Sequence, residues 1–245
     1  MSRSLTLGAI LRATLLAAVF ASMLTAAFHS LVTEPVIDQA IALEEQHQHA
    51  LGMPEEEPAV SRPAQKLGLI LGWGIYGLTF GLLFAAAYQA ARGLLPAASE
   101  AAKGLWVTVL AYGSVVLLPA LKYPANPPGQ GDPETIGYRQ ALFLGLMLLG
   151  VVGSAAAIAA AHRFGPSTRR ALLASALTWL VAAVMLVGLL PPSPDALTMD
   201  AGIVMTFRQL SLAGLTLFWL AFAVLFSWMV SRRTEASLHP APTTA

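Results

Sequence analysis

Long apolar runs alternate with short polar stretches along the whole chain. A helix that crosses a bilayer needs about 20 consecutive, mostly apolar residues, and runs near that length recur six times. They lie near residues 7–32, 67–91, 104–121, 139–161, 171–190 and 210–230. The pattern predicts an all-α, polytopic integral membrane helix bundle of about six spans. Because the third run is the shortest, five spans are the alternative.

The first apolar run has two interpretations. Arg3 ahead of an apolar run is typical of a secretory signal peptide, but this run is long for one and TAAFHS at its end is a poor cleavage site. We therefore interpret residues 1–33 as the first transmembrane helix. Residues 34–66 then form an outer loop rich in His and acidic residues, 67–231 the remaining bundle and 232–245 a disordered cytoplasmic tail.

The composition agrees with lipid as the main solvent. The 245 residues are 56% hydrophobic and 11% charged, whereas soluble domains carry about 25% charged residues. Cysteine is absent, which excludes disulfides and thiolate metal sites. There is no basic patch interleaved with aromatic residues, so we expect membrane lipid and no nucleic acid as a partner.

The distribution of basic residues predicts the orientation of the bundle. If the N-terminus is cytoplasmic, the inner segments hold nine of the 14 Lys and Arg residues. Short loops rich in Lys and Arg stay on the cytoplasmic side. We therefore predict a bacterial inner-membrane protein with both termini in the cytoplasm and residues 34–66 outside.

The outward segment carries candidate metal ligands. His47 and His49 follow directly after the neighbouring carboxylates Glu44 and Glu45. On a helix, Glu45 and His49 share a face, whereas on an extended segment His47 and His49 do. Imidazole and carboxylate together suit divalent cobalt, nickel or zinc, and His29 near the outer end of the first run is a further candidate ligand. The alternative is a solvated acidic loop without a metal.

Two pairs of spans share a sequence pattern. Leu-Leu-Pro, a Pro-rich outer loop and aromatic-Arg-Gln occur between spans three and four and again between spans five and six. We predict parallel helical-hairpin repeats, in which a proline ends one helix and an Arg-Gln pair opens the next. These pairs are Arg139 with Gln140 and Arg208 with Gln209. The arginines either anchor the helices at the headgroups or bind loop carboxylates and close the outer ends of the bundle. The carboxylates on those loops include Asp132, Glu134, Asp195 and Asp200.

The second span contains two pairs of glycines at small-xxx-small spacing. These pairs are Gly68 with Gly72 and Gly77 with Gly81. Small residues at this spacing allow helices to approach closely in a membrane, so we predict tight packing here. A pore lining or hinge is the alternative.

Sequence signatures of catalysis are absent. The chain has no His-Glu-x-x-His, no Gly-x-Ser-x-Gly and no phosphate-binding loop. We therefore do not expect an enzyme or a bound organic cofactor, and any ATP-driven step would belong to another chain.

The chain resembles the CbtA family, the predicted cobalt transporter subunit. The resemblance rests on EPVIDQAIALEEQHQHA, LLPALKYPANPPGQGDPETIGYRQ and FRQLSLAGLTLFWLAFAVLFSW. It implies an all-helical membrane protein, usually described with five spans, a context of cobalamin biosynthesis and a small, His-rich, single-span partner, CbtB. Relatives often carry histidines in the loop before the last span, where this chain has none. That departure weakens the case for cobalt more than the case for the fold.

These features predict a membrane subunit for the uptake of a divalent metal, cobalt first of all, which captures the ion at the outward His/carboxylate segment. The alternative is a non-transporting membrane scaffold that assembles a partner complex.

Overall fold

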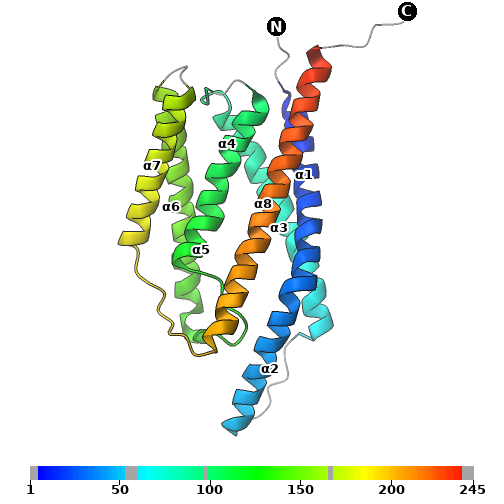
Figure 1. Ribbon diagram of the computed structural model, residues 1–245, viewed down its shortest axis with the longest axis vertical. Coiled ribbons are helices and arrows are strands. Elements are labelled where there is room, and N and C mark those ends of the chain that lie inside the picture. Colours follow the sequence, from blue (N-terminus) through cyan, green and yellow to red (C-terminus); the bar gives the residue numbers. More distant parts are fainter. Residues whose placement is uncertain (1–4, 53–59, 97–98, 165–167, 239–245) are drawn as a thin grey trace, which may run out of the picture.

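The computed structural model describes residues 5–52, 60–96, 99–164 and 168–238. Within these ranges the chain is a bundle of helices without a strand (Figure 1). The elements are α1 (Leu7–Phe28), η1 (His29–Thr33), α2 (Glu34–Ala50), α3 (Arg62–Ala91), α4 (Glu100–Tyr112), η2 (Gly113–Leu117), α5 (Leu118–Lys122), η3 (Pro133–Thr135), α6 (Ile136–Arg163), α7 (Thr168–Leu189) and α8 (Ala201–Leu238). Of the short elements, η1 and η2 are π-helical turns and η3 is a 3₁₀ turn.

Six helical segments of the described chain are long and apolar enough to cross a membrane. They are Leu7–Ala50, Arg62–Ala91, Glu100–Lys122, Pro133–Arg163, Thr168–Leu189 and Ala201–Arg233. The predicted all-α bundle of six spans is thus confirmed, and the third run is one of the six. The expected disordered tail is wrong in part, because α8 continues as a helix to Leu238.

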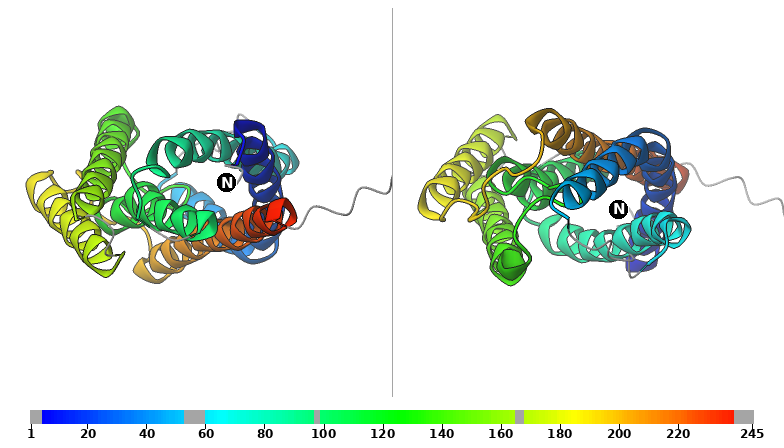
Figure 2. Two further views of the ribbon diagram at one scale, coloured as in Figure 1. Left: turned by 90° about the horizontal axis from the view of Figure 1, so that it is seen from above. Right: turned by 90° about the horizontal axis from the view of Figure 1, so that it is seen from below.

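The helices run up and down between two ends of the bundle. α1 begins and α8 finishes at the same end, which we name the terminal end, while α2 projects from the opposite end, the α2 end (Figure 1). The α5–α6 and α7–α8 connections also lie at the α2 end. Seen from either end, α7 and the α1–α3 pair occupy opposite sides of the molecule (Figure 2).

α1 and α3 pack closely against each other. Ala17, Ala18 and Ala21 of α1 are completely buried. A Cβ placed at Gly81 of α3 would lie 3.0 Å from the Ala18 Cβ, and one at Gly77 would lie 3.0 Å from the Ala18 carbonyl oxygen. These two glycines therefore let the two backbones meet, as predicted.

The other glycine pair of α3 has a different environment. No atom lies within 4 Å of a Cβ built at Gly68 or Gly72. The prediction of tight packing is wrong for this pair, because these positions point away from the neighbouring helices.

The first and last spans are adjacent in space, since α8 packs on α1 and on α4. Phe218, Phe222 and Phe226 of α8 recur at every fourth position and are almost completely buried, so they form one helix face. Two aromatic residues of α3 pack edge-on against this face, with ring centroids 4.8 Å apart for Phe84 and Phe222 and 5.2 Å apart for Tyr88 and Phe226. These aromatic contacts join α3 to α8.

Buried hydroxyl groups connect α6 and α7 to the rest of the bundle. Ser114 in η2 donates a hydrogen bond of 2.7 Å to the Gly150 carbonyl of α6. The indole of Trp179 in α7 donates to the Ser114 oxygen at 3.2 Å, and Trp106 of α4 donates to Ser175 of α7 at 3.1 Å. These bonds satisfy polar groups that would otherwise be costly inside a membrane.

The predicted hairpin repeat differs in its packing between the two pairs of spans. α6 packs against α5 and η2 of the preceding span, whereas α7 packs mainly on α6 and α8 packs on α1 and α4. In the described part of the chain, the fifth and sixth spans therefore do not form a packed hairpin as the third and fourth do (Figures 1 and 2). α7 thus packs on the span that precedes it, whereas α8 packs on spans far from it in the sequence.

We expect Gly77→Leu to destabilise the protein by about 1–3 kcal/mol, because overpacking a tight contact forces side chains and backbone to shift. Gly74→Leu is the matched control, since no atom lies within 4 Å of a Cβ at Gly74 in the same helix. Thermal unfolding of the two purified variants in the same detergent measures the difference. Equal melting temperatures would show that the α1–α3 contact does not require glycine.

Candidate functional site

The first helix is far longer than a membrane requires. It runs over 44 residues, Leu7–Ala50, or about 66 Å at 1.5 Å per residue, and the hydrocarbon core of a bilayer is about 30 Å thick. α2 therefore continues past the other helices at its end of the bundle (Figure 1).

A π-helical turn lets this helix continue through a proline. Pro35 stands two residues after the end of η1, and its ring would clash with the carbonyl of Leu31 in a regular α-helix. The wider π turn gives the ring room. Pro119 follows η2 in the same way. The expectation that a proline ends the third span is therefore wrong, since α5 continues through Pro119 to Lys122.

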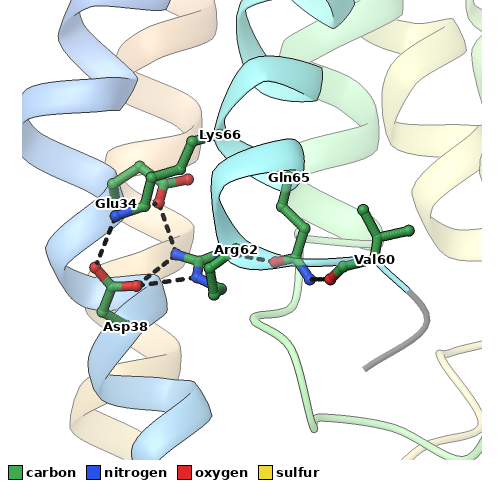
Figure 3. A network of polar contacts seen from close by, with 6 residues as sticks. All are labelled: Glu34, Asp38, Val60, Arg62, Gln65 and Lys66. Atoms are coloured by element: carbon green, nitrogen blue, oxygen red, sulfur yellow. Dashed lines mark hydrogen bonds and ion pairs between the residues drawn. The ribbon is translucent and has the colours of Figure 1, made fainter. Parts of the chain in front are cut away.

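Ion pairs fix the base of α2 against the start of α3 (Figure 3). Arg62 donates a hydrogen bond of 2.7 Å to Glu34, whose side chain is 8% exposed, and also pairs with Asp38. Lys66 lies 3.3 Å from Asp38 and 3.6 Å from Glu34. Two carboxylates are thus neutralised by two cations.

The same contacts act on the protonation of Asp38, which lies in the part of the helix beyond the apolar run. The hydrogen bond from Arg62 holds the pKa of the Asp38 carboxyl below its usual value, and Lys66 acts in the same direction. The carboxylate therefore stays charged, and the pair stays intact, into acid.

The candidate metal ligands lie on the projecting helix α2. Because residues 34–50 are helical, the helical alternative holds, and Glu45 and His49 are exposed one turn apart on the same face. Glu44 points elsewhere, since its Cδ lies 2.8 Å from a Cβ built at Gly129 of the α5–α6 loop. The side chain of His47 lies outside the described residues, and its backbone position is on another face than His49.

The number of ligands brought together is small. Among the described residues no three His, Asp or Glu side chains are placed to hold one metal ion. The carboxylates at 55–57 lie outside the described residues. Among the described side chains, Glu45 and His49 therefore offer two ligands to an ion.

His29 lies inside the bundle and not at its surface. The imidazole is 6% exposed, its Nδ1 is 2.8 Å from the Thr33 hydroxyl, and its ring stacks on Trp73 of α3 at a centroid distance of 5.1 Å. The Nε2 faces the Gly214 backbone of α8 and has no partner among the described residues. His29 is separated from His49 by 20 residues of helix, about 30 Å, so the two cannot bind one ion within a chain.

The two arginines of the repeated pattern bind the connecting loops crosswise. Arg139 at the start of α6 reaches the α7–α8 loop, where its Nε lies 2.9 Å from Asp195 Oδ2. This contact is a charge pair without hydrogen-bond alignment. Arg208 of α8 reaches the α5–α6 loop, where it donates to the Asn126 side-chain oxygen at 2.8 Å and to the Ala125 carbonyl at 3.3 Å. Asp195 was among the expected partners of the arginines, whereas Arg208 contacts a carbonyl and an amide instead of a carboxylate.

Gln130 completes the connection between these loops. Its amide donates to the Ala196 carbonyl at 2.8 Å, and its oxygen accepts from the backbone of Thr198 and Met199, both at 3.1 Å. Gln130 is 6% exposed, so it replaces water as the partner of three backbone groups. The α5–α6 and α7–α8 loops are therefore held together as one unit.

Comparison with known proteins assigns the chain to a family. The family model described as "Probable cobalt transporter subunit (CbtA)" matches residues 7–231. The chain belongs to the CbtA family. Among the curated proteins and the solved structures, no match was found. The resemblance noted from the sequence is confirmed, and with six apolar helices this CbtA chain is a multi-pass membrane protein of a transporter-subunit family.

Two features of the site were missed from the sequence. The stripe of Glu34, Asp38, Glu45 and His49 along one face was visible, but its pairing with Arg62 depends on how α3 returns beside α2. The burial of His29 depends on Trp73 and Gly214, which come from two other helices. A single histidine at the end of an apolar run does not indicate in the sequence that Trp73 and Gly214 will enclose it.

We expect Arg62→Gln to loosen α2, because the nearly buried Glu34 loses the nearer of its two cations and keeps only Lys66 at 3.6 Å. The chain has no cysteine, so spin labels at Leu43→Cys and Gly68→Cys report the α2–α3 distance alone. The distance distribution should broaden in Arg62→Gln at every pH and stay narrow in the control Arg169→Gln.

With Arg62 present, the lowered pKa of Asp38 means that the Arg62–Asp38 pair stabilises α2 above about pH 4 and that this stabilisation is lost as pH falls further. A narrow distribution in Arg62→Gln would contradict the pairing.

Proposed function

We propose that the chain is the membrane subunit of a divalent-metal uptake system with cobalt as the first candidate substrate, and that it captures the ion on α2. The observation that carries the proposal is a helix that leaves the bundle with Glu45 and His49 exposed one turn apart. Membership of the CbtA family supports the choice of metal. Nickel and zinc suit the same ligands.

The ligand count supports capture rather than tight storage. A carboxylate and an imidazole bind a divalent ion weakly when water supplies the remaining ligands, and weak binding lets the ion leave again. His47 lies two residues from both Glu45 and His49, which on a helix is the opposite face of α2, so it would bind an ion together with a partner chain. Glu44 lies next to Glu45 on α2, but its side chain is turned toward Gly129. His29 is the candidate acceptor inside the bundle, and α8 would have to move away from its Nε2 before an ion could bind there.

A partner chain fits this picture. The family is described as a subunit of a transporter, and a small, His-rich, single-span protein of the CbtB type would supply imidazoles beside α2. The alternative function, a membrane scaffold without transport, needs the same helices but no ligands on α2.

We expect His47→Ala with His49→Ala to lower cobalt accumulation in cells or membrane vesicles severalfold, since imidazole is the stronger ligand of the proposed pair. Because imidazole binds a metal ion only in its neutral form, uptake by the natural chain should also fall when the medium is acidified. Radioactive cobalt or nickel uptake measures both effects.

The matched control is Gln46→Ala with Gln48→Ala, which changes the same turn of α2 without removing a proposed ligand. Unchanged uptake in a stably expressed histidine double variant would favour the scaffold and leave α2 as a polar extension. The same fall in both double variants would assign the effect to the helix and not to the imidazoles.

The proposed location is the inner membrane of a bacterium, with the terminal end in the cytoplasm. Basic residues support this orientation, because the connections at the terminal end are short and rich in them. Those described there are Arg92, Lys103, Arg163, Arg169, Arg170, Arg232 and Arg233.

We expect a reporter fused after Arg233 to be cytoplasmic and one inserted between residues 52 and 60 to be on the other side. Alkaline phosphatase and green fluorescent protein fusions give opposite signals on the two sides. A cytoplasmic signal from the insertion between 52 and 60 would reverse the orientation, and α2 would then face the cytoplasm.

A further inference from the structure

A large crevice lies between α6 and α8. It has a volume of about 1230 Å³ and is lined by both helices, by η2 and α5 behind them, and by the two connecting loops at the α2 end. α6 and α8 pack on other helices and make no extensive contact with one another in the described part of the chain. The crevice therefore separates two membrane-spanning helices, and its lining includes the exposed apolar side chains of Leu144 and Met205.

The polar groups of the crevice come from the repeated Arg-Gln pattern. Arg139 and Gln140 line the α6 wall, and Arg208 and Gln209 line the α8 wall. Deeper in the crevice the lining is apolar and includes Val116, Leu142, Phe143, Leu212 and Leu215. The lining is thus divided into a polar part and an apolar part.

The charges in the polar part do not cancel. Arg139 is paired with Asp195 at 2.9 Å. Arg208 contacts only neutral groups, the Ala125 carbonyl and the Asn126 amide, and no carboxylate lies within ion-pair distance of it among the described residues. One positive charge is therefore uncompensated, which is costly beside hydrocarbon.

Both arginines lie at the depth of the lipid headgroups. The last span, Ala201–Arg233, has 33 residues, or about 50 Å, which exceeds the roughly 30 Å core by about 10 Å at each end. Arg208 stands seven residues after Ala201, or about 10 Å along the helix, at the edge of the core. The same reasoning places Arg139, six residues after Pro133 in a span of 31 residues, about 9 Å along its helix, close to this edge.

The charge decides between possible occupants. Arg208 would repel a divalent cation, so the crevice is a poor route for a metal ion. An apolar helix from a partner would fill the crevice but leave the charge of Arg208 uncompensated. A molecule with one negative charge at headgroup depth and hydrocarbon below satisfies both parts of the lining.

We propose that this crevice binds an anionic phospholipid of the membrane. Its phosphate is bound by Arg208, with the amides of Gln209 and Gln140 as further donors, and an acyl chain lies against the apolar wall of Phe143, Leu212 and Leu215. Basic sites between transmembrane helices are suited to such headgroups. The proposal goes beyond metal uptake and does not depend on it.

The test uses the purified full chain in detergent without added metal. Phosphatidylglycerol should bind saturably in native mass spectrometry and raise the melting temperature. Phosphatidylcholine with the same acyl chains, or inorganic phosphate at the same concentration, should do neither. Arg208→Gln should weaken phosphatidylglycerol binding by about tenfold, since one charge-assisted contact is lost.

Arg170→Gln is the matched control, because it removes an exposed arginine of α7 at the terminal end. Ser211→Trp keeps both arginines and narrows the crevice, so it should also weaken binding and serves if Arg208→Gln does not fold. Equal binding by Arg208→Gln and Arg170→Gln, or by Ser211→Trp and the natural chain, would overturn the proposal. Equal effects of phosphatidylcholine or of phosphate alone would overturn it too.

Discussion

The close approach of α1 to its neighbours is the contact on which the rest of the structure depends. Inside a bilayer, helices gain little by hiding apolar surface from lipid, so they associate where small side chains allow backbones to touch. Ala17, Ala18 and Ala21 provide such a face on α1, and Gly77 and Gly81 provide its counterpart on α3. Because α1 is held in this way, its continuation α2 has a defined direction, and the imidazole at their junction is enclosed between α3 and α8.

The projecting helix and the crosswise loops give the α2 end two different electrostatic characters. On one side, acidic groups of α2 are partly neutralised at its base by Arg62 and Lys66 and remain exposed farther out at Glu45. On the other side, the crevice between α6 and α8 keeps the unbalanced charge of Arg208. The proposed metal ligands and the proposed lipid site therefore lie at separate places on the same end, where the two would not compete.

The spans could be predicted from the sequence because a bilayer sets the length of an apolar helix. The repeated Arg-Gln pattern also allowed the ion pair between Arg139 and a loop carboxylate to be predicted. The neighbours of each helix could not be predicted, because the buried and lipid-facing sides of α7 and α8 are both apolar. The repeated phenylalanines of α8 mark a face but not the helices that cover it. The separation of α7 from α8 and the enclosure of His29 by Trp73 and Gly214 depend on contacts between distant parts of the chain. The passage of a helix through Pro35 depends instead on a local π-helical turn that the apolar pattern does not reveal.

The packing of α8 on α1 also has a consequence for biosynthesis. The ribosome makes α1 well before α8, yet the buried face of α1 is shared between α3 and α8. The α1–α3 pair can assemble early, whereas the aromatic face of Phe218, Phe222 and Phe226 arrives only after the five preceding spans have been made. Until then, part of α1 and α4 must be covered by lipid or by the insertion machinery. A chain that stops before α8 would insert five helices and still lack its core, and quality-control proteases would meet it in that state.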